Sequence, residues 1–97
     1  MAELLDAEAI RALLAGMPEW TGNTEVIVRT AELRSFAGAV AAVNAVAAVA
    51  EELDHHPDID IRWRTVTFRC ATHAAGGVTE RDFVLARRID DILRGAA

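Results

Sequence analysis

Three histidines and one glutamate are the residues whose types and spacing in this chain best suit chemistry. His55 and His56 are adjacent, His73 lies further along, and Glu51 precedes His55 by one helical turn. Imidazoles titrate near neutral pH and can therefore both donate and accept protons in a reaction. A carboxylate on the same helix face could accept a proton from His55 and fix its tautomer. The pattern predicts a general acid–base site.

The same residues also have plain structural interpretations. A Glu–His pair at this spacing is often a solvated surface contact. His55 and His56 fall at the end of a predicted helix, where their side chains could cap free carbonyl groups. A zinc site is a further alternative, but the chain has one cysteine and neither a CxxC nor an HExxH motif. We therefore expect no bound metal.

Other potentially reactive or aromatic side chains are predicted to have packing or capping roles. Cys70 alternates with Phe68 along a predicted strand, so we expect it in the core and not as a nucleophile. Ser35 precedes a long helical run and is expected to cap it. Trp20 and Trp63 are expected in the core, Trp63 because it continues the alternation of the preceding strand. Covalent catalysis is not expected.

Capping residues and hydrophobic periodicity divide the chain into three helices and two hairpins. In order, these are a helix from Asp6 to about Ala15, a hairpin between Trp20 and Arg29, a helix from Ser35 ended by Pro57, a hairpin from Ile59 to Thr72, and a helix from Thr79 to about Leu93. This order predicts an α+β fold in one domain, 1–97, with a four-stranded antiparallel sheet and three helices packed on one face. Because the two strands of the second hairpin are antiparallel, its two ends should lie close together and bring His56 near His73.

Composition limits the partners that we expect. The chain is 53% apolar and 26% charged, as in a folded domain, and its net charge of -5 argues against nucleic-acid binding. The apolar run 36–50 is too short and alanine-rich for a membrane span, and the acidic start is unlike a signal peptide, so we expect a cytoplasmic protein. The helix containing Val43 and Val46 is apolar almost all round, which predicts a sheet on one face and another helix, of this chain or of a partner subunit, on the other.

Three segments read Glu-Glu-Leu-Asp-His-His-Pro over 51–57, Thr-His over 72–73, and Gly-Gly-Val-Thr-Glu-Arg-Asp over 76–82. Together they resemble the pterin-4a-carbinolamine dehydratase family. The family joins a Glu four residues before His-His-Pro to a Thr-His after the next hairpin and a Gly-Leu-Ser/Thr-Glu-Arg-Asp entering the last helix. The spacings here agree throughout. The chain departs from many relatives at Ile59, where they have an aromatic residue, and at Ala71 and Ala74, where they have polar ones.

The resemblance implies dehydration of a 4a-hydroxytetrahydropterin to quinonoid dihydropterin and water, in the recycling of tetrahydrobiopterin. It implies no metal and no organic cofactor, and a homodimer or homotetramer. The resemblance implies that His55, His56 and His73 are catalytic and that Glu51 orients His55. It implies that Asp54 and Thr72 contact the polar edge of the pterin. It also implies that Arg81 and Asp82 support the cleft wall through ion pairs.

A rival interpretation is a protein without enzymatic activity. Members of this fold also act as dimerisation or assembly partners, including a transcriptional coactivator. Loss of the histidines would favour that role, but this chain retains all three together with Glu51. The dehydratase reading therefore comes first and the binding role second.

Overall fold

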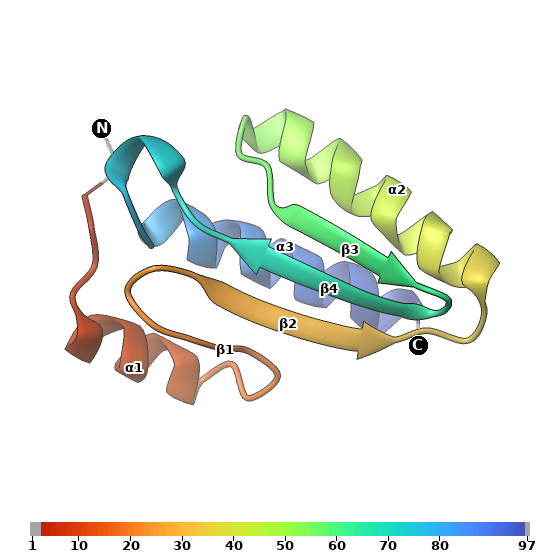
Figure 1. Ribbon diagram of the computed structural model, residues 1–97, viewed down its shortest axis with the longest axis horizontal. Helices are drawn as coiled ribbons and strands as arrows, with labels where there is room; N and C mark the ends of the chain where they lie inside the picture. Colours follow the sequence, from red (N-terminus) through yellow and green to blue (C-terminus); the bar gives the residue numbers. More distant parts are fainter. Residues whose placement is uncertain (1–2, 97) are drawn as a thin grey trace.

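A computed structural model describes residues 3–96, in which helices and strands follow the predicted order (Figure 1). The elements are α1 (Ala7–Ala15), β1 (Thr21–Gly22), β2 (Ile27–Glu32), α2 (Phe36–Leu53), β3 (Asp58–Arg62), β4 (Thr65–Cys70), the short 3-10 helix η1 (His73–Ala75) and α3 (Glu80–Ala96). The predicted α+β class and the order α-β-β-α-β-β-α are confirmed.

The sheet is antiparallel, with strand order β1-β2-β4-β3. Central β4 pairs with β2 from Ile27↔Cys70 to Glu32↔Thr65, and with β3 from Asp58↔Arg69 to Arg62↔Thr65. Residues on alternate positions of a strand face opposite sides of the sheet. The register therefore fixes which side chains of β3 and β4 face the helices and which face solvent.

One hydrophobic core lies between the helices and the inner face of the sheet. Its fully buried members include Phe68 and Cys70 of β4, and Phe83 and Ile89 of α3. The core position predicted for Cys70 is confirmed, as is that of Trp20. The core position predicted for Trp63 is wrong, because its side chain is exposed.

Trp63 lies outside the core because the hairpin turns one residue earlier than simple alternation implies. β3 ends at Arg62 and β4 begins at Thr65, so Trp63 and Arg64 form the turn between them. Trp63 is 72% exposed and has a φ of 54°. A two-residue connection requires unusual backbone angles. Trp63 therefore does not continue the alternation by which Ile59 and Ile61 face the helices.

Helix α2 presents a buried face and an exposed alanine-rich face. Ala39, Val46 and Val49 are buried in the core, whereas Ala41 and Ala45 are exposed. By length and composition alone α2 is apolar enough to cross a membrane. The same composition suits a helix that packs on a sheet, which its five buried residues do. Val46 is 0% exposed, so it belongs to the core and not to a face that a second subunit could cover.

Gly77 lies where two loops meet the N-terminal segment. The N–H of Val78 donates to the carbonyl of Thr24, and the N–H of Leu5 donates to the carbonyl of Val78. A Cβ on Gly77 would come within 2.5 Å of the Thr24 carbonyl oxygen. The backbones approach so closely that no side chain fits between them.

We predict that Gly77→Ala lowers the free energy of unfolding by about 2 kcal/mol, because the new methyl forces the loops apart. Gly95→Ala is the matched control, since nothing lies within 4 Å of its Cβ position in α3. The control should be neutral or should stabilise the helix by up to about 1 kcal/mol. Urea unfolding followed by circular dichroism measures both, and equal values for the two variants would contradict the steric argument.

Candidate active site

The C-terminal end of α2 determines where the paired histidines point. Asp54 adopts the left-handed conformation (φ 49°, ψ 45°), and its N–H donates to the carbonyls of Ala50 and Glu51. The N–H of His55 donates to the Ala50 carbonyl at 3.0 Å. The bond from Asp54 to Glu51 and the bond from His55 to Ala50 together form a Schellman motif, which ends a helix by reversing the chain. The helix therefore ends at Leu53, not at Pro57 as predicted.

The chain reversal directs His55 into the protein. Its Nε2 lies 2.6 Å from Oδ1 of Asp82, and the pair is buried, with side-chain exposures of 9% and 0%. A carboxylate removed from water is unfavourable unless hydrogen bonds replace its hydration. Here the imidazole supplies one such bond and is itself held in a fixed orientation.

The other oxygen of Asp82 holds the start of α3 and the end of β4. Oδ2 accepts hydrogen bonds from the Thr79 N–H at 2.9 Å and from the Thr72 hydroxyl at 2.8 Å. Thr79 Oγ1 in turn accepts from the Arg81 N–H, so Thr79 and Asp82 form a capping box. The Thr72 and Thr79 hydroxyls lie 2.7 Å apart. Asp82 therefore joins the two ends of the β3–β4 hairpin to α3.

Glu51 pairs with His56, and the predicted pair with His55 is wrong. Glu51 Oε2 hydrogen-bonds His56 Nε2. The prediction assumed that the helix continued through His55, whereas the Schellman turn moves His55 inward and returns His56 toward Glu51. Both members of the observed pair are exposed, with side-chain exposures of 55% and 77%. An exposed pair of this kind contributes little to stability.

Arg81 supports the turn through backbone carbonyls and not through the predicted ion pair. Its Nη2 donates to the Asp54 carbonyl at 2.7 Å and to the Leu53 carbonyl at 3.4 Å. These bonds satisfy groups at the end of α2 and connect it to α3. Together with His55, Leu53 and Val84, Arg81 lines a hollow of about 100 Å³.

The structure places all three histidines next to this network. His56 follows His55, and His73 follows Thr72, both of which hydrogen-bond Asp82. His73 is exposed at the start of η1. The Thr72 hydroxyl is engaged with Asp82, and Asp54 is exposed. The contacts predicted for Asp54 and Thr72 with a substrate stay predictions.

The role of Asp82 as the partner of His55 was missed by the sequence interpretation, which gave it only structural support. A usable signal was present, because Thr79-Glu80-Arg81-Asp82 has the spacing of a capping box. That spacing places the Asp82 carboxylate over the first turn of the helix. The sequence contains no comparable signal that His55 reaches it.

The buried cysteine adds no chemistry at this corner. Burial raises the pKa of the Cys70 thiol far above its usual range, and the carboxylates of Asp82 and Asp58 raise it further. The thiol is therefore neutral and unreactive. Within 3–96, no group of three or more histidine, cysteine, aspartate or glutamate side chains is arranged to hold a metal ion.

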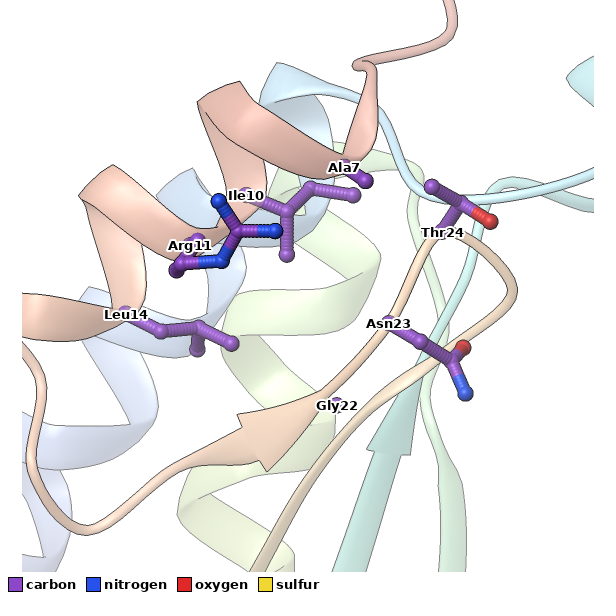
Figure 2. Close-up of a pocket in the computed structure, with 7 residues that line it drawn as sticks. All are labelled: Ala7, Ile10, Arg11, Leu14, Gly22, Asn23 and Thr24. Carbon is purple, nitrogen blue, oxygen red and sulfur yellow. The ribbon is translucent and has the colours of Figure 1, made fainter.

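A larger hollow between α1 and the β1–β2 turn lacks converging polar groups. Its volume is about 310 Å³, and Ile10, Arg11 and Leu14 extend along it from α1 (Figure 2). Figure 2 shows the polar ends of Asn23 and Thr24 directed away from the helix. The Asn23 side-chain oxygen instead accepts the N–H groups of Glu25 and Val26, which stabilises the turn. The histidine corner is the better candidate for chemistry.

The family model described as pterin 4 alpha carbinolamine dehydratase matches residues 3–92. This chain belongs to that family. A relative from Nocardia farcinica, named "Putative pterin-4-alpha-carbinolamine dehydratase", is 53% identical over 92 residues, which cover 95% of this chain and 97% of the relative. The family resemblance seen in the sequence is confirmed.

Two solved structures are similar in fold. A transcriptional coactivator/pterin dehydratase from Brucella melitensis superposes with a TM-score of 0.87 at 30% identity, over 96% of this chain and 98% of that one. A pterin dehydratase-like protein, identified as a RuBisCO assembly factor in the alpha-carboxysome, gives a TM-score of 0.62 at 24% identity, over 75% and 84%. The second similarity concerns the fold alone.

We predict that Asp82→Ala lowers the free energy of unfolding by about 3 kcal/mol, because it leaves His55, Thr72 and the Thr79 N–H without their buried partner. Asp82→Asn should cost only about 1 kcal/mol, because its carbonyl can accept from both threonines while its amide faces His55. Nε2 of His55 must then accept a hydrogen bond, so the ring changes tautomer.

Urea unfolding gives the two free energies, and ¹⁵N NMR of the imidazoles reports the tautomer of His55. Equal destabilisation by both substitutions, or an unchanged His55 tautomer in Asp82→Asn, would contradict this account of the network.

Proposed function

We propose that this protein catalyses the dehydration of a 4a-hydroxytetrahydropterin to quinonoid dihydropterin and water, in tetrahydrobiopterin recycling. The observation that carries the proposal is the pair of imidazoles, each bonded through Nε2 to a carboxylate, at one corner of a dehydratase-family fold. When a neutral imidazole donates its Nε2–H to a carboxylate, Nδ1 remains as a proton acceptor. When the ring is cationic, the same nitrogen is a proton donor.

The reaction needs both capacities. A proton is delivered to the 4a-hydroxyl as the C4a–O bond breaks, and the proton on N5 is removed as the C4a=N5 double bond forms. Water leaves and no electrons are exchanged with a cofactor. His55, His56 and His73 supply the proton transfers in this proposal. In the same proposal, Asp82 orients the ring of His55 and Glu51 orients the ring of His56. Asp54 and Thr72 contact the polar edge of the pterin.

We predict that the protein accelerates the decay of freshly generated 4a-hydroxytetrahydropterin, followed by ultraviolet absorbance, and that the acceleration saturates with substrate. His73→Ala should lower kcat about 100-fold, the usual contribution of a positioned acid or base. Glu51→Gln should lower it about tenfold, because His56 loses its charged partner while the fold stays intact.

Glu52→Gln is the matched control, since Glu52 is the neighbouring glutamate of α2 and pairs with Arg88 of α3. It should leave kcat unchanged. An absence of acceleration by the folded wild-type protein would sink the dehydratase proposal. Equal effects of the substitutions at Glu51 and Glu52 would remove Glu51 from it.

A homodimer or homotetramer is the second part of the proposal, supported by the exposed alanines along α2. Small side chains permit close approach of a second helix, and an apolar face along an 18-residue helix is costly to leave in water. The substitution must be made at an exposed position, because a charge at buried Val46 would disrupt the core itself.

We predict that Ala45→Glu converts the wild-type oligomer to a smaller species while its circular dichroism spectrum is unchanged, because two charged helix faces repel each other and lose apolar contact. Native mass spectrometry measures the change. Ala12→Glu, at an exposed alanine of α1, should leave the mass as in wild type. A wild-type monomer, or an Ala45→Glu oligomer of unchanged mass, would show that this face of α2 is not an interface.

A further inference from the structure

The small hollow that borders His55 has an apolar wall and a polar one. Leu53 of α2 and Val84 of α3 form the apolar wall, and Arg81 of α3 lines the hollow as well. Its volume is about 100 Å³. Pockets that enclose a whole drug-sized ligand measure roughly 300–1,000 Å³. The hollow is therefore too small for a bicyclic pterin, but it can hold a short substituent of a pterin whose ring lies outside it.

Val84 is an apolar side chain that remains exposed beside a candidate catalytic imidazole. It keeps 41% of its surface in water. Arg81 lies one turn before it and Arg88 one turn after it, and both donate to groups at the C-terminal end of α2. Residues three and four positions apart share a helix face, so Val84 faces the same end of α2. A ligand group that covers Val84 and Leu53 removes apolar surface from water, which favours binding.

The Arg81 guanidinium supplies the polar wall with unused donors. Both of its bonds to the backbone carbonyls of Leu53 and Asp54 use Nη2. Among residues 3–96, no group accepts a hydrogen bond from its Nε or Nη1. A guanidinium can donate from all three nitrogens, so these two can serve hydroxyl groups of a ligand. An apolar wall beside such donors suits a short alkyl chain that carries hydroxyls.

The bonding of the pterin ring determines which of its substituents would reach this hollow. In a 4a-hydroxytetrahydropterin, C4a carries the leaving hydroxyl and is bonded to N5, and N5 is bonded to C6. The first atom of a C6 substituent is therefore only two bonds from N5. An imidazole that exchanges a proton at N5 or at the 4a-hydroxyl must lie close to whatever C6 carries. His55 borders the hollow, so a pterin that reacts there has its C6 substituent beside Leu53 and Val84.

We propose that this space, the Val84 hollow (Leu53, His55, Arg81 and Val84), receives the C6 substituent of the pterin and selects a short hydroxylated chain. The inference rests on the proposed function, because it takes a pterin bound beside His55. Leu53 and Val84 contact the carbon atoms of the chain, and Arg81 donates to its hydroxyls. The side chain of Val84 sets how much room the chain has.

The test measures binding by isothermal titration calorimetry, which is independent of catalysis. Three 7,8-dihydropterins, carrying methyl, propyl or 1,2-dihydroxypropyl at C6, are titrated into the full chain. Wild type should bind both three-carbon compounds more tightly than the methyl compound, and the dihydroxypropyl compound most tightly. Val84→Phe fills the hollow and should weaken binding of the three-carbon compounds about 10-fold, the lower end of what pocket fit around one methylene is worth. Binding of the methyl compound should be unchanged.

Asp91→Phe is the matched control, because it introduces the same ring at an exposed position two turns further along α3, outside the hollow. It should bind all three compounds as wild type does. The inference is overturned if wild type binds none of the compounds or binds them equally. It is also overturned if Val84→Phe weakens all three alike, or if Asp91→Phe has the same effect as Val84→Phe.

The outcome for this hollow is separable from that for the proposed reaction. The expected binding differences in a protein that does not accelerate dehydration would support the hollow as a pterin subsite and sink the catalytic proposal. Acceleration of dehydration by a protein without these differences would overturn the hollow and leave the catalytic proposal standing.

Discussion

The buried carboxylate of Asp82 is the constraint on which the arrangement of the candidate site depends. A carboxylate that is 0% exposed is tolerated only when its oxygens are fully hydrogen-bonded. Two of the three donors, at the end of β4 and the start of α3, lie near Asp82 in sequence, and the third, in the segment after α2, lies 27 residues before it. The hydrogen bonds to the Asp82 carboxylate therefore fix three chain segments relative to each other. The positions of the adjacent histidines follow from that requirement.

The two paired histidines have different environments because of one residue in the left-handed conformation. Asp54 reverses the chain, so His55 enters the protein and His56 returns to the surface. Both rings bond a carboxylate through the same nitrogen, but only the pair with Asp82 is shielded from water. A buried pair is rigid, whereas an exposed pair exchanges with solvent and can adjust to a bound molecule. One corner thus offers a fixed imidazole beside an adaptable one.

Local rules predicted most of the fold but not the pairing of side chains across it. Asp6 and Ser35 cap their helices as expected, because a cap needs only the next three residues. The Glu51–His55 pair failed because helical spacing was extended past a turn that ends the helix. Asp82 was assigned no imidazole because His55 lies 27 residues away in sequence, and nothing local encodes that contact. Family resemblance supplied the candidate residues of the site but not their partners.

The β3–β4 hairpin connects two ends with opposite physical character. At one end, buried hydrogen bonds fix the chain around Asp82; at the other, Trp63 keeps an apolar ring in water at the expense of backbone strain. The two strands pair continuously from Asp58↔Arg69 to Arg62↔Thr65, so the hairpin holds its two ends at a constant separation. Contacts made at the turn need not disturb the imidazoles, because the ladder between them has no break. The proton transfers proposed for one end are therefore physically compatible with contacts made at the other.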